Sequence, residues 1–213
     1  MAKWWAVAAL ALTVVGCTRS VESPRAQPAP AIGPVSVLQV GDLLSPDIFD
    51  KDGNLFAAVE PERCAGAARE VDPPFITDYD PAAEDGGHWP TTAGGVDVVV
   101  EEMVAVYPSD YSAEEALASA RSTLEACGDT TVTVTTMSDR TYTFDVESAA
   151  QPAPAGAVLW SLRAADWNCD NLFVAAHNAA IEMTSCGAAG GVDVAAAAED
   201  ALRRIEALAD NKA

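Results

Sequence analysis

A chain of 213 residues, half of them hydrophobic, is long enough to bury the core of one ordinary domain. Its 32 acidic residues against 12 basic ones give a formal net charge of −20, with the acids spread along the whole chain. This charge argues against nucleic acid and bare anionic lipid surfaces as partners, and it predicts a solubilising acidic surface.

The N-terminus has the pattern of an export signal. Lys3 precedes an apolar run, Trp4 to Val15, that is shorter than the roughly 20 residues a membrane-spanning helix needs. The run leads into Val14-Val15-Gly16-Cys17, which resembles the lipobox cleaved by lipoprotein signal peptidase. The resemblance implies that residues 1–16 are removed and that Cys17 carries lipid, including acyl chains such as palmitate, at the extracytoplasmic face of the cell membrane. An ordinary secretory signal with a chance cysteine is the alternative.

Residues 17–35 are interpreted as the lipidated cysteine and a tether. After Cys17, this segment contains Ser, Ala, Gln and four prolines, a composition that buries too little apolar surface to fold. We therefore expect the folded domain to occupy residues 36–213.

The four other cysteines predict two disulfides, because an exported protein with an even number of cysteines normally pairs them. A hairpin that turns at His177-Asn178 would place Cys169 directly opposite Cys186. That pairing leaves Cys64 for Cys127. The spacings contain no CxxC and no Cys/His pair at ligand distance, so no metal site is expected at these cysteines.

Helical segments are expected on both sides of a β-rich region. Ser112 and Glu115 have the spacing of a capping box in front of apolar residues at intervals of three and four, with Gly128 just beyond. Asp193 similarly caps an amphipathic C-terminal segment. The expected helical ranges are 37–44, 61–68, 113–126 and 194–208.

Strands are indicated by β-branched and apolar residues between turn signals, and their expected ranges are 96–107, 130–137, 141–147, 157–163, 171–176 and 179–184. Consecutive strands of this kind form hairpins. The sequence therefore predicts an α+β fold in which helices pack on one face of an antiparallel β-sheet.

Residues 71–92 are rich in Pro, Gly and acids and are interpreted as a long irregular loop. His88 lies in it beside Glu84 and Asp85 and could be oriented as a base. The alternative is a cation site that gathers four acids of this loop, namely Asp78, Asp80, Glu84 and Asp85. A solvated acidic loop is the simpler interpretation.

Other catalytic and cofactor motifs are missing from the sequence. No serine lies in a GxSxG frame, no cysteine is left as a nucleophile, and His177 sits at the expected hairpin turn. An EF-hand frame around Gly53 fails because Ile48 and Val59 would take its first and twelfth positions. GxGxxG and Walker patterns are absent. We expect no enzyme activity, no catalytic residues, no cofactor and no metal.

Several short motifs together resemble the extracellular sensor domain of mycobacterial PknH-type Ser/Thr kinases, a domain also found alone on actinobacterial lipoproteins. They are the alanine-rich helix ending at Cys127 and the segments Asp42–Pro46, Pro61–Gly66, Trp167–Cys169 and Ala175–Ala180. The resemblance runs from about residue 36 to 210 and rests mainly on the order and spacing of the cysteines. It implies the same two disulfides and an α+β domain with a groove for an undefined extracellular ligand, without catalysis. The loop 72–89 matches no part of that family.

The sequence thus predicts a cell-envelope lipoprotein, anchored through Cys17, whose extracytoplasmic sensor-like domain binds an unknown small molecule or protein in a groove. The alternative is a non-enzymatic interaction protein that presents its acidic surface to envelope or host proteins.

Overall fold

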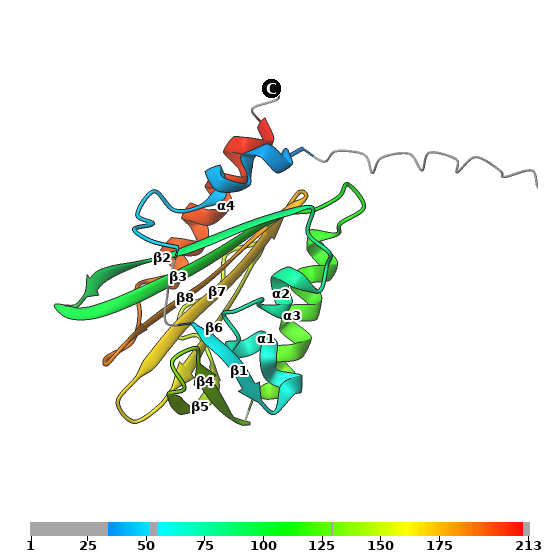
Figure 1. The fold of residues 1–213 in the computed structure, drawn as a ribbon. Coiled ribbons are helices and arrows are strands. Elements are labelled where there is room, and N and C mark those ends of the chain that lie inside the picture. The colour runs from blue at the N-terminus through cyan, green and yellow to red at the C-terminus, as the bar shows by residue number, and fades with distance from the viewer. Residues whose placement is uncertain (1–33, 52–54, 129, 211–213) are drawn as a thin grey trace, which may run out of the picture.

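The computed structural model describes residues 34–51, 55–128 and 130–210. They form one curled antiparallel sheet of eight strands in the order β1-β4-β5-β6-β7-β8-β3-β2, with helices against both of its faces (Figure 1). The strands are β1 Phe56–Glu60, β2 Ala83–Ala93, β3 Val96–Val106, β4 Thr131–Thr136, β5 Thr141–Ser148, β6 Ala157–Arg163, β7 Asn168–Ala176 and β8 Ala179–Gly187. The helices are η1 Val37–Leu43, η2 Glu62–Cys64, α1 Ala65–Ala68, α2 Pro74–Thr77, α3 Ala113–Cys127 and α4 Val194–Asp210. The signal peptide, Cys17 and the tether up to residue 33 lie outside the described residues.

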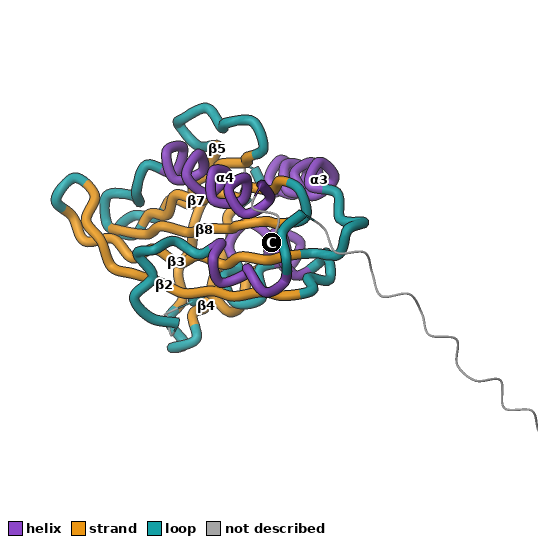
Figure 2. The backbone as a smooth tube through the Cα atoms, turned by 90° about the horizontal axis from the view of Figure 1, so that it is seen from above, coloured by secondary structure: helices purple, strands orange, loops and turns teal. Residues whose placement is uncertain are grey.

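The prediction that helices pack on one face of the sheet is wrong. In β7, Leu172 and Val174 belong to the core under α4 and η1, while Phe173 and Ala175 belong to the core under α1, α2 and α3. Figure 2 shows α4 lying along β7 and β8. Strands buried on both faces read as continuous apolar runs and do not alternate with polar residues, which is the pattern of residues 172–176 in β7.

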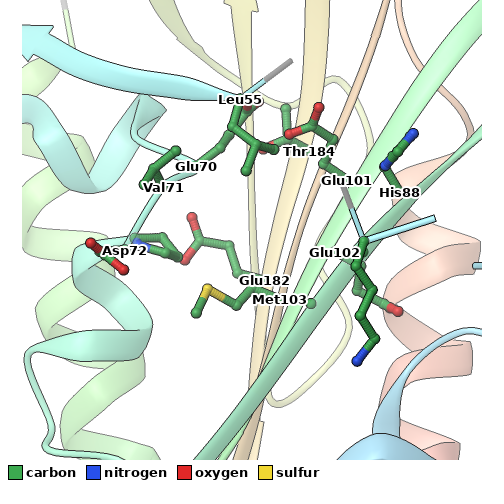
Figure 3. Close-up of a pocket in the computed structure, with 14 residues that line it drawn as sticks. Leu55, Glu70, Val71, Asp72, His88, Glu101, Glu102, Met103, Glu182 and Thr184 are labelled. Carbon is green, nitrogen blue, oxygen red and sulfur yellow. The ribbon is translucent and has the colours of Figure 1, made fainter. Parts of the chain in front are cut away.

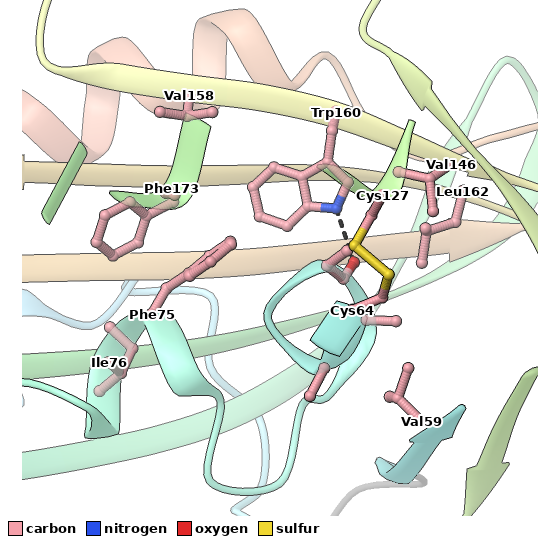
Figure 4. Close-up of a cluster of buried hydrophobic side chains, with 14 of the residues drawn as sticks. Val59, Cys64, Phe75, Ile76, Cys127, Val146, Val158, Trp160, Leu162 and Phe173 are labelled. Carbon is pink, nitrogen blue, oxygen red and sulfur yellow. Dashed lines mark hydrogen bonds between the residues drawn. A yellow bond between two sulfur atoms is a disulfide. The ribbon is translucent and has the colours of Figure 1, made fainter. Parts of the chain in front are cut away.

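Trp160 of β6 lies at the centre of the first core, the one under α1 to α3 (Figure 4). Its indole Nε1 donates a hydrogen bond of 2.8 Å to the carbonyl oxygen of Ala67 in α1. The ring of Phe75 in α2 meets it edge-on, with the ring centroids 5.8 Å apart. The two short helices α1 and α2 are thus held against the sheet by one aromatic side chain.

Both expected disulfides are present in the structure. Cys64 and Cys127 join the end of η2 to the end of α3, with their Cα atoms 5.8 Å apart (Figure 4). Cys169 and Cys186 are direct cross-strand partners in the β7–β8 hairpin, with their Cα atoms 4.1 Å apart. The hairpin turns at residues 177 and 178, as the sequence predicted.

In the second core, between the sheet and α4, Arg204 of α4 is inserted beside Glu102 of β3. Its Nη2 lies 2.6 Å from Glu102 Oε1, and its Nη1 donates to the carbonyl oxygen of Leu43. The other oxygen of Glu102 accepts a 2.6 Å hydrogen bond from the backbone N–H of Ser45. The Glu102 side chain is inaccessible to solvent, so Arg204 is what keeps this carboxylate paired.

One residue that was expected in the tether packs in the folded domain. Val35, assigned above to the tether, is fully buried. Its N–H donates to Asn178 Oδ1 at 2.9 Å, and its carbonyl oxygen accepts from Asn178 Nδ2 at 3.0 Å. The same Nδ2 donates to the carbonyl oxygen of Tyr107, just after β3. A single buried amide therefore fastens the start of the domain to the β7–β8 turn and to the end of β3.

The interpretation of residues 71–92 as one irregular loop is also wrong, because this range contains α2 and all of β2 except Ala93. β2 is an edge strand that pairs with β3 alone along its length, and edge strands tolerate proline, here Pro90. The outer side of β2 meets the segment after η1 in an isolated bridge between Asp50 and His88. This contact covers part of an otherwise unpaired edge.

Within the described ranges, α3, α4 and the shorter helices all lack the length and apolar character of a membrane-spanning helix.

Candidate functional site

A cavity of about 250 Å³ lies between one face of the sheet and the segment Glu70–Pro73, which joins α1 to α2. The sheet contributes residues of β2, β3 and β8, and Leu55, just before β1, closes another side. The two edges of the curled sheet thus approach each other at this cavity. Figure 3 shows Glu70 and Val71 of the covering segment on one side and Met103 and Glu182 of the sheet on the other.

Strand register places the floor of the cavity in two rows of cross-strand neighbours. One row is Gly86, Met103 and Glu182, and the next is His88, Glu101 and Thr184. Directly paired residues of adjacent strands point to the same face, so all of these side chains point toward the covering segment. Gly86 has no side chain, and this leaves its end of the first row open.

The covering segment is fixed by hydrogen bonds at both ends. Arg69 donates to the carbonyl oxygen of Asp72 from Nε at 3.2 Å and from Nη2 at 3.0 Å. The N–H of Phe56 at the start of β1 donates to Glu70 Oε2 at 2.9 Å, and the N–H of Glu70 returns a bond to the Phe56 carbonyl. The wall of the cavity is therefore an ordered part of the fold.

Glu182 carries the most unusual chemistry in the cavity. Its side chain rises from the interior strand β8, and the residue is only 7% exposed. Its Oε2 has no hydrogen-bond partner in the described part of the chain. Burial raises the pKa of this carboxyl group well above the value of an exposed glutamic acid.

The carboxyl group of Glu70 is perturbed in the same direction. Burial raises its pKa, and so does the nearby charge of Glu101, with which it shares a hydrogen bond. The bond from the Phe56 N–H opposes this shift but does not cancel it. Three carboxyl groups from three separate elements, Glu70, Glu101 and Glu182, therefore converge on one partly apolar space.

The lysine and the arginine nearest the cavity are already engaged with acids. Lys51 at the rim of the cavity forms an ion pair with Asp85. The side chain of Asp85 is on the face of β2 that is turned away from the covering segment. Arg204 pairs with Glu102 on the opposite face of the sheet. The balance of charge inside the cavity is consequently negative.

A smaller cavity of about 60 Å³ continues the first one, since Glu70, Glu101 and Thr184 line both. Its other walls include the rings of Phe56, Tyr142 and Trp167. The two cavities together form a groove that is acidic at one part and aromatic at the other. We call it the acidic groove.

A family model described as "PknH-like extracellular domain" matches residues 47–207, about three quarters of the chain. The chain belongs to the family of PknH-like extracellular domains. Among solved structures, the crystal structure of the extracellular domain of PknH from Mycobacterium tuberculosis is similar, with a TM-score of 0.61 and 18% sequence identity. The match covers 84% of this chain and 98% of that one, and at this identity it shows the shared fold. A search of curated proteins gave no match.

The structure separates the residues of the PknH-like domain that its sequence placed together in an acidic loop. His88 and Glu84 lie on β2 on the side of the covering segment, whereas Asp85 lies on the other side in its pair with Lys51. Asp78 and Asp80 follow α2. Across the described ranges, His, Cys, Asp and Glu form no group of three suited to a metal ion, so the alternative of a cation site at these four acids is not realised.

His177 stands at the β7–β8 turn, where its backbone has a positive φ of 53°. Its Nε2 lies 2.9 Å from Glu206 Oε2 of α4. His88 lines the acidic groove, and its Nδ1 is buried without a partner among the described residues. The two histidines therefore lie in separate parts of the domain.

Sequence reasoning missed Glu70, Glu101 and Glu182. Each signal was weak by itself, because a single glutamic acid in a strand or loop is usually solvated. One signal was available in β8, where Glu182 interrupts a run that is otherwise free of charge over residues 179–187. A lone charged residue inside a strand that is buried on both faces has either a buried partner or a function.

The raised pKa of Glu182 gives a prediction for stability against pH. The folded chain holds this proton more tightly than the unfolded chain does, so the contribution is complete below the unfolded pKa and is lost as pH rises through the folded pKa. Glutamine does not titrate, so Glu182→Gln should lose less stability than the parent as pH rises. We therefore expect the melting temperature of Glu182→Gln, relative to that of the parent, to increase from pH 5 to pH 8. Glu199→Gln, at an exposed site on α4, is the control and should follow the parent. Parallel curves for all three proteins would contradict the assignment.

Proposed function

We propose that this PknH-like domain is a sensor-like ligand-binding domain on an extracytoplasmic lipoprotein, and that its ligand binds in the acidic groove. The observation that supports this most strongly is Glu182, a buried carboxyl group with an unpartnered oxygen on the floor of the groove. A buried polar group without a partner costs about 1 to 3 kcal/mol, and a ligand that supplies the partner recovers that energy.

The remaining walls have the character of a small-molecule site. Leu55, Val71 and Met103 supply apolar surface, while Thr184 and the carboxyl groups supply a few directed polar atoms. Binding sites commonly combine a concave apolar lining with a few such groups. The proposal includes binding and no chemical step.

The test compares two valine-to-tryptophan variants of the full chain. Val71 lines the groove, whereas Val37 of η1 is exposed and lies away from it, so only the first substitution fills the groove. Each protein is purified from an actinobacterial host in mild detergent under oxidising conditions, and its solvent extract is analysed by mass spectrometry. We expect one compound to be retained by the parent and by Val37→Trp and to be depleted at least tenfold in Val71→Trp. If no compound is enriched in the parent over Val71→Trp, groove binding is rejected.

We further propose that the domain is held at the cell membrane through lipid on Cys17, with the tether running to Pro34. The lipobox-like motif and the family of extracellular domains both support this arrangement. Cys17→Ser should abolish incorporation of labelled palmitate and move the protein from the membrane fraction to the soluble fraction. A Cys17→Ser protein that remains in the membrane fraction would contradict anchoring at this residue.

The alternative, an interaction protein that presents its acidic surface, stays a prediction. The large apolar side chains exposed in the described residues are Val37, Leu38, Phe49, Val99 and Met137.

A further inference from the structure

We infer that the acidic groove binds a small organic cation, with the ammonium group among Glu70, Glu101 and Glu182 and an apolar body toward Phe56, Tyr142 and Trp167. This inference rests on the proposed function, because it names the chemical class of the ligand for that groove.

The charges around the groove favour a cation over an anion or a neutral ligand. Glu70, Asp72, Glu101 and Glu182 line the groove from the covering segment, β3 and β8. Of the basic side chains at its wall, Lys51 is paired with Asp85, and His88 is the other. An anion would add to the repulsion among these carboxyl groups, whereas a cation would relieve it.

Glu182 supplies an observation that is independent of the local count of acids. Its unpartnered Oε2 is buried on the floor of the cavity, and a charge-assisted hydrogen bond is stronger at a buried site than in water. An ammonium group brings several N–H donors to one point and can serve this oxygen together with the carboxyl groups of Glu70 and Glu101.

The shape of the groove favours an organic cation over a metal ion. His, Cys, Asp and Glu in the described ranges provide no group of three with metal-binding geometry, and this includes the three glutamic acids here. The adjoining cavity is bounded by three aromatic rings, which attract both apolar groups and organic cations. A ligand with a positive head and an apolar body would fill both cavities.

Binding of such a ligand requires the carboxyl groups that face it to ionise. The titratable and charged groups around the site are Lys51 before β1, Glu70 and Asp72 on the covering segment, His88 on β2, Glu101 and Glu102 on β3 and Glu182 on β8. Of these, Glu102 is paired with Arg204 on the other face of the sheet. Burial raises the pKa of Glu182 and Glu70, so a bound cation displaces protons that these groups still hold. The affinity for the cation should therefore rise with pH, and protons should be released on binding.

The experiment titrates the full-length protein at pH 7 with three probes that share one ring and differ in charge: benzylammonium, phenylacetate and benzyl alcohol. Calorimetry in two buffers of different ionisation enthalpy measures affinity and proton release together. We expect benzylammonium to bind with proton release. Benzyl alcohol should bind at least about tenfold more weakly than benzylammonium, and phenylacetate should not bind. Glu182→Gln should weaken benzylammonium by about tenfold, and Glu199→Gln should leave it unchanged.

Equal binding of benzyl alcohol or phenylacetate, or no binding of any probe, would overturn the assignment of ligand class. The Val71→Trp comparison decides the proposed function separately. A retained compound that is neutral or acidic would preserve groove binding and reject the cation.

Discussion

Replacing Arg204 with leucine is expected to lower the free energy of unfolding by about 3 to 5 kcal/mol, because the carboxylate of Glu102 is then left buried and without its charged partner. Arg204 and Glu102 lie between α4 and β3, and the Glu102 side chain has no access to solvent. Removing one member of a buried ion pair is far more damaging than removing one member of an exposed pair.

Arg203→Leu is the matched control for this prediction. Arg203 is the preceding residue of α4 and pairs with Asp200 at 2.9 Å, but its side chain is 66% exposed. Its loss should change the stability by about 1 kcal/mol or less. Urea unfolding of both variants measures the difference, and the double variant Glu102→Gln/Arg204→Leu should recover part of the loss. If Arg203→Leu and Arg204→Leu unfold at the same urea concentration, the buried pair does not hold α4 to the sheet.

The second large effect concerns the disulfides. Converting Cys64 and Cys127 to alanine should lower the free energy of unfolding by about 4 kcal/mol, and converting Cys169 and Cys186 should lower it by about 3 kcal/mol. The order follows from the sequence separations of 63 and 17 residues, because closing the longer loop removes more entropy from the unfolded chain. The first pair also joins α3 to η2, two elements without a shared strand pairing.

Thermal melting of the parent and both double variants under oxidising conditions checks this order. The parent in reductant should melt below either variant, because it lacks both bridges. A Cys64→Ala/Cys127→Ala protein that melts with the parent would show that the longer loop is already ordered in the unfolded state.

Much of the fold could be predicted from the sequence because its signals are local. The caps at Ser112 and Asp193 mark the starts of α3 and α4. In the structure both side chains accept hydrogen bonds from backbone N–H groups of the first helical turn. The β4–β5 and β7–β8 hairpins were equally clear, since alternating or continuous apolar runs flank short turns. The β7–β8 register in turn indicated which cysteines pair.

The missed parts depend on contacts between residues that are distant in the chain. β2 contains two glycines, a proline and three charged or titratable residues, and it becomes a strand only because β3 provides a partner along its whole length. Helices cover both faces of the sheet because β7 and β8 are buried on both faces. The apolar run 172–176 in β7 indicated this, and the prediction overlooked it. The resemblance implied a groove, but its acidic lining could not be predicted, since Glu70 meets Glu101 and Glu182 only after the sheet has curled.

The hydrogen bonds of the Asn178 amide with Val35 and Tyr107 determine where a force on the tether would enter the domain. If Cys17 is anchored, any pull along the tether enters at Val35 and passes through the Asn178 amide to the β7–β8 turn and the end of β3. β8 and β3 are interior strands with a neighbour on each side, so the load spreads into the middle of the sheet. The edge strands β1 and β2 beside the groove lie off this path. A pull on the tether would therefore reach β3 and β8, the strands that supply Glu101, Met103, Glu182 and Thr184 to the floor of the groove.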